Sequence, residues 1–352
     1  WYPVRPPYRR KIRWSKYSYL SGRPVLRKGH ALWVIMPCLS KTARPQISAG
    51  LWECKARNNP LVSKSGTFAS DIIKLIPKVK VTTMTKSSLI NNLKSMGLTG
   101  SETILIHSSM KAVGNVEGGA DTVLDALMEF FADGLLLLPT HTWKTVNESN
   151  PVFDVSNSES CVGILTELFR RRPGVVRSLH PTHSIAAFGR NAESYIAGEL
   201  SCNTPCTPGG CYDRLKDVDG KILLIGVTHA RNTYIHSVEE VLNVPNRLSD
   251  KPMKLSVIDN SGNSHTVYMR KHYNASQPHI SEDFVKLAQA YIDCGAARNV
   301  MFGDAPSVLC NARGIFNVTR HVLAPAPECF ITEDVISSER WADFPGNEFS
   351  QE

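Results

Sequence analysis

From Met84 onward, apolar residues follow the spacing of helices and of short buried strands. Residues 87–96 and 121–131 carry apolar side chains at helical spacing, whereas 103–107 and 135–138 are short, almost wholly apolar runs. The resulting order of strand, loop, helix and strand predicts a βαβ unit. Such a unit implies a parallel sheet with helices packed on its faces.

The same alternation continues toward the C-terminus. We expect helices at 162–171, 233–242 and 281–293, strands at 184–188, 221–227, 299–302 and 307–310, and a hairpin of 255–259 with 266–270. The hairpin is predicted because Ser261, Gly262 and Asn263 separate its two strands. The pattern therefore predicts a single α/β domain with a central, mostly parallel sheet flanked by helices, plus an antiparallel hairpin.

Composition divides the chain into three segments. Residues 1–83 hold 17 Lys and Arg but only Glu53 and Asp71, and eight prolines interrupt them, whereas 84–352 hold 23 basic and 30 acidic residues. We expect a basic N-terminal extension at 1–83, the folded domain at 84–325 and a polar, frayed tail at 326–352. The extension is interpreted as a disordered arm for anionic surfaces, a transit peptide, or sequence translated ahead of the true start.

Nine cysteines and the absence of a recognisable secretion signal bear on location. An early apolar run, 31–39, is too short to span a bilayer and contains Pro37. We therefore expect reduced thiols, a cytoplasmic protein and no membrane partner. Cys202, Cys206 and Cys211 lack the paired spacing of zinc ligands, so no metal is expected.

The loop that follows the first predicted strand is a candidate anion site. It runs from His107 to Gly119 and enters a helix, so hydroxyls, glycines and backbone N–H groups gather at a positive helix N-terminus. It matches neither the P-loop nor the dinucleotide fingerprint. Ser108 and Lys111 do fit the S-x-x-K motif of serine acyl-enzymes, whose companion motifs are missing, and this remains a third hypothesis.

Two histidines are candidates for acid–base chemistry. His180 precedes Pro181 and is therefore held in extended backbone, while His236 and Glu239 are three residues apart and share one face of a predicted helix. A carboxylate beside an imidazole raises its pKa and orients its tautomer. These residues do not decide which imidazole removes a proton, and each also fits a purely structural role.

Taken in order, these motifs resemble the aminoglycoside 3-N-acetyltransferase family. The likeness runs from about Met84 to Pro325 and is carried by 106–114 (IHSSMKAVG), 117–127 (EGGADTVLDAL), 151–154 (PVFD), 177–181 (RSLHP) with Ser184, Ala187 and Gly189, then Thr233, His236, Glu239 and 244–247 (VPNR). The basic extension, the cysteine-rich loop and the last residues depart from the family pattern.

The resemblance implies the antibiotic acetyltransferase fold and direct acetyl transfer from acetyl-CoA to the 3-amino group of a 2-deoxystreptamine aminoglycoside, which confers antibiotic resistance. The catalytic residues implied are His180, His236 and Glu239. The CoA-binding residues implied are His107, Ser108, Ser109, Lys111, Gly114, Val116, Gly118 and Gly119. Asp154 and Glu240, with an acidic rim, are implied to meet the substrate's ammonium groups.

The partners expected are CoA and an aminoglycoside or a similar polycationic amine, with a homodimer left open. Two alternatives stand beside this reading. One is an N-acetyltransferase for another amine. The other is a nucleic-acid-binding protein that uses the basic arm, in which Arg, Trp and Tyr are interleaved; nucleic acid is not expected as a partner of the acidic body.

Overall fold

The computed structural model describes residues 83–345. The basic extension expected at 1–83 therefore lies outside the described residues except for Thr83. Within the described part, no helix has the length and apolar character needed to cross a bilayer.

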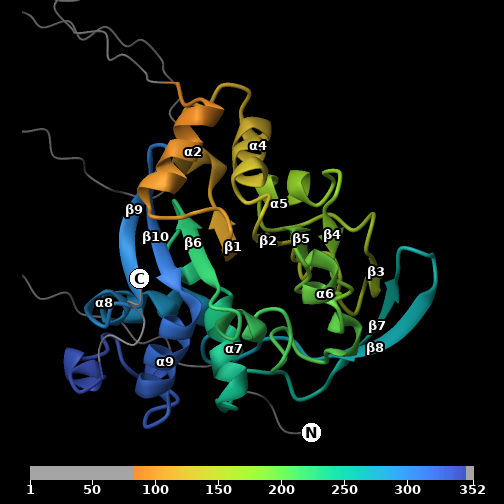
Figure 1. The fold of residues 1–352 in the computed structure, drawn as a ribbon. Helices are drawn as coiled ribbons and strands as arrows, with labels where there is room; N and C mark the ends of the chain where they lie inside the picture. Colours follow the sequence, from red (N-terminus) through yellow and green to blue (C-terminus); the bar gives the residue numbers. More distant parts are fainter. Residues whose placement is uncertain (1–82, 346–352) are drawn as a thin grey trace, which may run out of the picture. The chain divides into compact units, whose positions relative to one another are not determined.

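A seven-stranded sheet forms the centre of the described chain (Figure 1). Its order is β4-β5-β2-β1-β6-β10-β9, with β1 pairing in parallel with both β2 and β6, and antiparallel pairing on either side. The strands are β1 (Thr103–Ser108), β2 (Leu135–Pro139), β4 (Val176–Arg177), β5 (Ile185–Gly189), β6 (Lys221–Ile225), β9 (Ala297–Phe302) and β10 (Ala305–Asn311).

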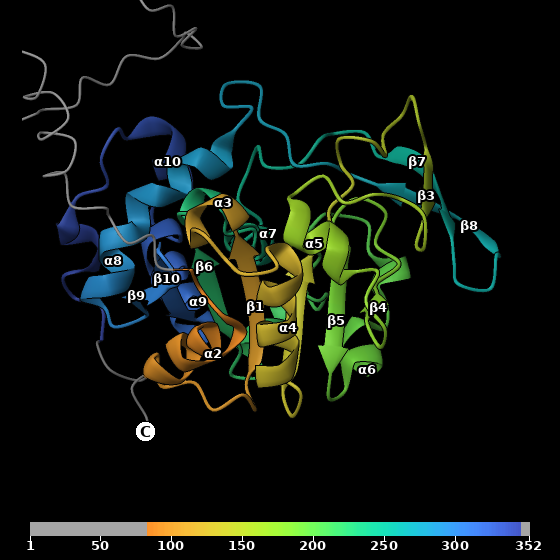
Figure 2. The ribbon, with the colours of Figure 1, turned by 90° about the horizontal axis from the view of Figure 1, so that it is seen from above.

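Helices cover both faces of this sheet (Figure 2). On one face lie α2 (Lys86–Ser95), α3 (Met110–Val113), α4 (Ala120–Phe130) and α5 (Ile164–Phe169). On the other face lie α7 (Tyr234–Val241), α8 (Ala288–Asp293) and α9 (Ala312–Leu323). The predicted α/β domain and its first βαβ unit are confirmed.

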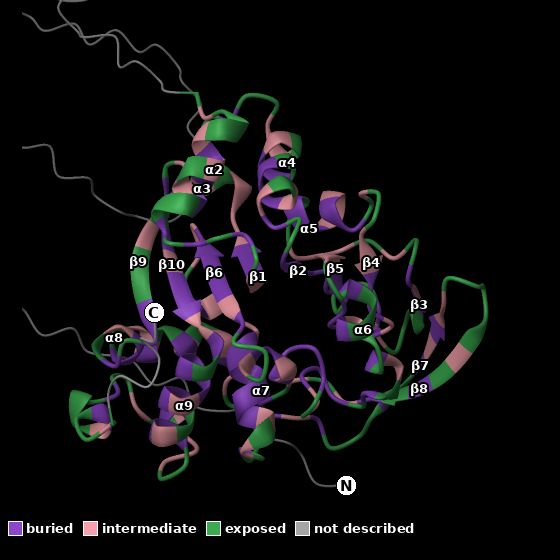
Figure 3. Ribbon diagram, viewed as in Figure 1, coloured by how far each residue is buried: buried purple, intermediate pink, exposed green. Residues whose placement is uncertain are grey.

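Alternation along the central strands explains why both faces are covered. In β1, Leu105 packs into the core shared with α7 and α9, whereas Ile104 and Ile106 pack into the core shared with α2 and α4. A strand with apolar side chains on both sides needs helices on both sides. The central strands are accordingly buried, and exposed residues gather on the outer helix faces (Figure 3).

A smaller sheet stands apart from the large one. It consists of β3 (Val152–Asp154), β7 (Met253–Ile258) and β8 (Ser264–Met269), where β7 and β8 form the predicted antiparallel hairpin. Its own apolar cluster includes Phe153 and Val257. The remaining short elements are α6 (Ala192–Ile196), α10 (Cys329–Thr332), η1 (Glu199–Ser201), η2 (Asp213–Lys216), η3 (His229–Arg231), η4 (Ile280–Leu287) and η5 (Ser338–Trp341).

Two expectations for the C-terminal third need correction. The helix expected at 281–293 is divided, because 280–287 form the 3-10 helix η4 and only 288–293 are α-helical. The frayed tail expected from 326 is wrong for 326–345. Phe330, Ile336 and Trp341 are buried in the core beneath α9, so this segment is held by apolar packing.

Candidate functional site

A cavity of about 900 Å³ opens at the carboxyl ends of the three parallel strands. His107 and Ser108 from the end of β1, Pro139 at the end of β2 and Val227 just after β6 line its floor. The parallel register places these strand ends together, since Leu105 lies opposite Leu137 of β2 and Ile222 of β6. This is the edge at which α/β sheets bind ligands.

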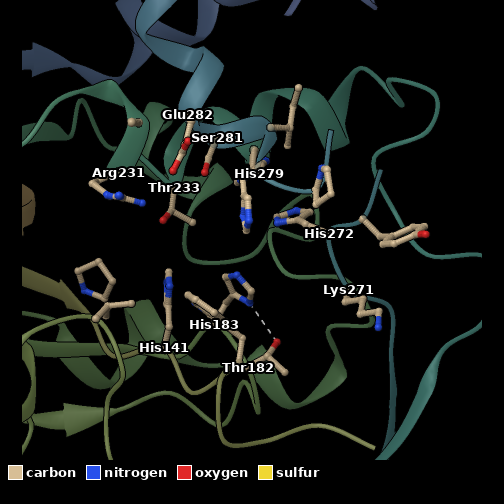
Figure 4. A pocket seen from close by; sticks show the side chains of 18 of the residues that line it. His141, Thr182, His183, Arg231, Thr233, Lys271, His272, His279, Ser281 and Glu282 are labelled. Carbon is tan, nitrogen blue, oxygen red and sulfur yellow. Dashed lines mark hydrogen bonds between the residues drawn. The ribbon is translucent and has the colours of Figure 1, made fainter. Parts of the chain in front are cut away.

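The walls come from loops that are distant in the sequence (Figure 4). Residues 143–149 follow β2, Thr233 and His236 belong to the start of α7, and Lys271 to Asn274 follow β8. The beginning of η4, with Ser281 and Glu282, closes one side. The cavity therefore joins the large sheet, the segment that follows the hairpin and the helical layer at one place.

The side chain of His236 is oriented by a buried carboxylate. Its Nδ1 lies 2.8 Å from Oε2 of Glu239, and Nε of Arg247 lies 2.6 Å from the other carboxylate oxygen. Burial alone would raise the pKa of the Glu239 carboxyl, but the His236 hydrogen bond and the Arg247 charge hold it below its ordinary value.

An ionised Glu239 only accepts hydrogen bonds, so the Nδ1 of His236 must carry the proton that it donates. The neutral ring then keeps its lone pair on Nε2. Within residues 83–345, no protein hydrogen bond occupies that nitrogen, and the His236 side chain lines the cavity. The arrangement is that of an imidazole prepared to accept a proton.

His180 has a different environment. Its Nδ1 accepts hydrogen bonds from the backbone N–H groups of His183 (2.9 Å) and Thr182 (3.3 Å), so Nε2 carries the proton and donates it to the carbonyl oxygen of Thr204 at 3.0 Å. The residue is 1% exposed and does not line the cavity. One ring nitrogen thus holds the backbone of its own loop, and the other holds the backbone at Thr204.

Three further histidines form a chain of neighbouring rings that begins at His236. None of the three was singled out from the sequence. His272 stacks on His236 with ring centroids 3.9 Å apart, His183 lies 5.5 Å from His272, and His141 lies 4.5 Å from His183. Burial, reinforced by the neighbouring imidazoles, lowers the pKa of His141 and His183 well below the ordinary value. These two rings are therefore neutral at pH 7.

Only two of the eight expected CoA-binding residues reach the cavity. These are His107 and Ser108. The Nε2 of His107 is buried and has no hydrogen-bond partner among residues 83–345, and burial lowers the pKa of this imidazole to about 3. A buried polar nitrogen at the floor of a cavity is available to a bound ligand.

The other six residues of the first loop shape the chain instead. Ser109 stands at the N-cap position of α3 without a side-chain capping bond, Lys111 is exposed, and Val116 is buried where it bridges to Met84. Gly114, Gly118 and Gly119 have positive φ angles of 93°, 72° and 65°, and a Cβ on Gly114 would collide with Asp304. None of the six lines the cavity.

The hypothesis of a serine acyl-enzyme finds no support in this loop. In the described residues, neither Ser108 nor Ser109 hydrogen-bonds an imidazole, as a serine nucleophile requires.

The two carboxylates expected to bind substrate are not part of the cavity lining either. Asp154 ends β3 and accepts hydrogen bonds from the backbone N–H groups of Ser156 and Asn157, both at 2.9 Å. Glu240 is turned toward His272 and accepts its Nε2–H at 2.8 Å. Neither side chain lines the cavity.

The expected acidic rim is reduced to two exposed carboxylates. Glu148 and Glu282 line the cavity mouth, and Arg231 and Lys271 line it as well. Since the opposite charges are equal in number, the lining alone does not form a strongly acidic cleft.

Comparison with known proteins places these features in one family. A family profile described as aminoglycoside 3-N-acetyltransferase matches residues 105–324. The chain is 29% identical over 261 residues to aminoglycoside N(3)-acetyltransferase VII of Streptomyces paromomycinus, covering 66% of this chain and 88% of the relative. It is 33% identical over 163 residues to aminoglycoside N(3)-acetyltransferase IV of a Salmonella species, covering 46% and 60%.

The fold has solved counterparts as well. A mutant of aminoglycoside acetyltransferase AAC(3)-IVa, crystallised in complex with a gentamicin, superposes with a TM-score of 0.61 at 26% sequence identity. The match covers 71% of this chain and 92% of that structure. The architecture derived above is therefore shared with proteins of this type.

Proposed function

The chain belongs to the aminoglycoside 3-N-acetyltransferase family, and from this premise we propose that it acetylates the 3-amino group of a 2-deoxystreptamine aminoglycoside with acetyl-CoA. The observation that carries the proposal is the His236 imidazole, oriented by Glu239 and facing the cavity. The acyltransferase class follows from the family. The antibiotic, the donor and the mechanism are what we propose.

His236 acts as the general base in this mechanism. An aminoglycoside amine is largely protonated at neutral pH, so it must lose a proton before its nitrogen can attack the thioester. The ammonium first gives one proton to solvent, and Nε2 of His236 takes a second proton from the nitrogen as the N–C bond forms. Collapse of the tetrahedral intermediate breaks the C–S bond, and the CoA thiolate leaves and is protonated by the imidazolium. Acetyl transfer is direct, with no acyl-enzyme.

Charge that develops on the thioester oxygen needs a hydrogen-bond donor. Ser108 is the hydroxyl-bearing residue of the first loop that lines the cavity, and it lies on the floor at the carboxyl ends of β1 and β6. We assign it the task of stabilising this oxyanion. A donor of this kind contributes about 10²–10³-fold in rate.

Glu148 and Glu282 take the role in substrate binding first expected of Asp154 and Glu240. Both carboxylates line the cavity mouth, where ammonium groups of a polycationic sugar can reach them. The gentamicin complex of the structural relative supports a substrate of this class. We further propose a cytoplasmic location, with residues 84–345 as the catalytic domain, since Phe330, Ile336 and Trp341 belong to its core.

The test is acetyl-CoA-dependent release of free thiol by the full chain, measured with a panel of 2-deoxystreptamine aminoglycosides. The position of the acetyl group in the product is then assigned by NMR. Rapid release with acetylation at the 3-amino group supports the proposal. Release with simple amines but with none of the aminoglycosides would favour an N-acetyltransferase for another amine, and a folded chain that does not bind CoA would overturn the assigned donor.

A further inference from the structure

Three potential metal ligands converge beside the cavity from separate parts of the chain. Cys206 lies in the loop after η1, Glu240 lies on α7, and His272 follows β8. The cysteine sulfur, a carboxylate oxygen and an imidazole nitrogen all lie within 4.8 Å of one another. None of these three residues has a role in the proton transfer described above.

The carboxylate of Glu240 is incompletely satisfied by the protein. Its Oε1 accepts hydrogen bonds from His272 Nε2 at 2.8 Å and from the backbone N–H of Cys206 at 2.9 Å. Its Oε2 is buried and, within residues 83–345, has no partner at hydrogen-bonding geometry; the Thr204 hydroxyl is near enough to help lower the pKa of this carboxyl but is hydrogen-bonded to Thr207 at 2.7 Å. Leaving such an acceptor unpaired costs about 1–3 kcal/mol, so buried oxygens of this kind generally meet a ligand.

The thiol of Cys206 is also weakly engaged. The residue is 2% exposed, and its Sγ makes only a long contact, 3.8 Å, with the carbonyl oxygen of Thr233. Burial raises the pKa of this thiol well above its ordinary value. A cation at this place would favour the thiolate, because a coordinated thiol is deprotonated.

The donor set selects the type of ion. One thiolate, one imidazole and one carboxylate are characteristic of zinc, whereas magnesium and calcium prefer oxygen ligands alone. Tetrahedral zinc with bonds of about 2.0–2.3 Å holds its ligand atoms about 3.3–3.7 Å apart. The three atoms reach that spacing by side-chain adjustments on the order of 1 Å.

We propose that Cys206, Glu240 and His272 bind one zinc-type divalent ion at the edge of the active-site cavity. Binding replaces the His272–Glu240 hydrogen bond by two metal bonds. The proton on Nε2 of His272 moves through solvent to Nδ1, so that the ring stays neutral, and the thiol proton of Cys206 is released to solvent. The ion fixes the ring of His272, which stacks on His236 with centroids 3.9 Å apart. It thereby fixes the position of the ring on which the general base, His236, is stacked.

The first experiment measures metal binding by the full chain after treatment with a chelator. Zinc is titrated and bound metal is counted by mass spectrometry, and Co²⁺ is then used as a spectroscopic probe. We expect one equivalent of metal and a thiolate-to-cobalt charge-transfer band. Absence of stoichiometric binding, or cobalt binding without a thiolate band, would overturn the proposal.

Variants assign the ligands. Cys206→Ser should abolish the charge-transfer band and lower zinc affinity at least about 10-fold, while Cys202→Ser, in the same loop but outside the ligand group, should leave both unchanged. Retention of the band in a folded Cys206→Ser protein contradicts the assignment. If Cys206→Ser does not fold, His272→Gln takes its place, and unchanged zinc affinity in that variant counts against the site. These readouts do not depend on acetyl transfer.

Discussion

Nδ1 of His236 lies 2.8 Å from Oε2 of Glu239, one turn along the same helix. The spacing of three residues puts both side chains on one face of α7, and burial keeps water from competing for the hydrogen bond. This pair separates the two imidazoles that the sequence left equivalent. In His180 the backbone occupies both ring nitrogens, whereas in His236 a carboxylate occupies one nitrogen and the side chain lines the cavity.

Replacing His236 should remove the general base without unfolding the protein. For His236→Gln we expect kcat to fall about 10²–10⁴-fold, since this is the usual contribution of a positioned base. Steady-state thiol release, with circular dichroism to confirm the fold, measures the effect. A folded variant that retains full kcat would mean that another group takes the proton.

The corresponding change at His180 should affect stability rather than chemistry. His180→Gln loses buried hydrogen bonds to His183, Thr182 and Thr204, so we expect the free energy of unfolding to fall by about 1–3 kcal/mol. Any activity that remains should show a nearly normal kcat per folded molecule. A loss of kcat as large as that of the His236 variant, at unchanged stability, would return the catalytic role to His180.

Glu239 is expected to serve both activity and stability. Glu239→Gln removes the charge that orients His236 and leaves the buried Arg247 without its 2.6 Å partner, so kcat should fall and unfolding should become easier by about 3 kcal/mol. Urea denaturation and thiol release measure the two effects.

Glu328→Gln is the matched control for this variant. Its carboxylate is 32% exposed and lies 3.3 Å from the same guanidinium, so the expected cost is below about 1 kcal/mol. Equal destabilisation by the two variants would show that burial of Glu239 does not strengthen its ion pair.

Buried neutral histidines should make the protein sensitive to mild acid. Burial lowers the pKa of His107 to about 3 and that of His229 to about 4, from 6.5. Between these values and 6.5 the unfolded chain binds protons that the folded chain does not, so the free energy of unfolding falls as pH falls through this window. Each group contributes a slope of up to about 1.4 kcal/mol per pH unit.

Urea denaturation between about pH 4.5 and pH 7 tests this dependence. In the lower part of the window, His229→Gln should reduce the slope of the free energy of unfolding against pH by up to about 1.4 kcal/mol per pH unit. The reason is that the unfolded variant can no longer take up a proton at this position. Identical slopes for the two proteins would show that His229 is protonated in the folded state.

The hydrophobic pattern was sufficient for the central sheet but not for the cavity. Strands 103–107 and 221–227 could be recognised because each is a continuous apolar run, and their carboxyl ends supply His107 and Val227 to the site. The hydrogen bonds that occupy His180 depend on the position of Thr204, which is 24 residues away. No local pattern encodes that contact.

Some residues of the site had a usable signal that the sequence interpretation did not exploit. His141 follows an apolar strand within two residues, in the manner of His107, and the rule that ligands gather at carboxyl strand ends applies to it directly. His272 had no such signal, because it lies in the irregular segment after β8 and reaches His236 only through the tertiary fold.

The C-terminal segment was misjudged because its apolar residues are sparse. Phe330 lies between polar and proline-rich stretches, yet its side chain is 0% exposed and packs against Phe284 with ring centroids 5.1 Å apart.

The packing of this segment can be tested at Phe330. Phe330→Ala should lower the free energy of unfolding by about 3–5 kcal/mol, because a fully buried aromatic side chain is removed. Val335→Ala, five residues away and 80% exposed, should change it by less than about 0.5 kcal/mol. Urea denaturation of the two variants decides the matter, since equally small effects would mean that residues 326–345 contribute nothing to the core.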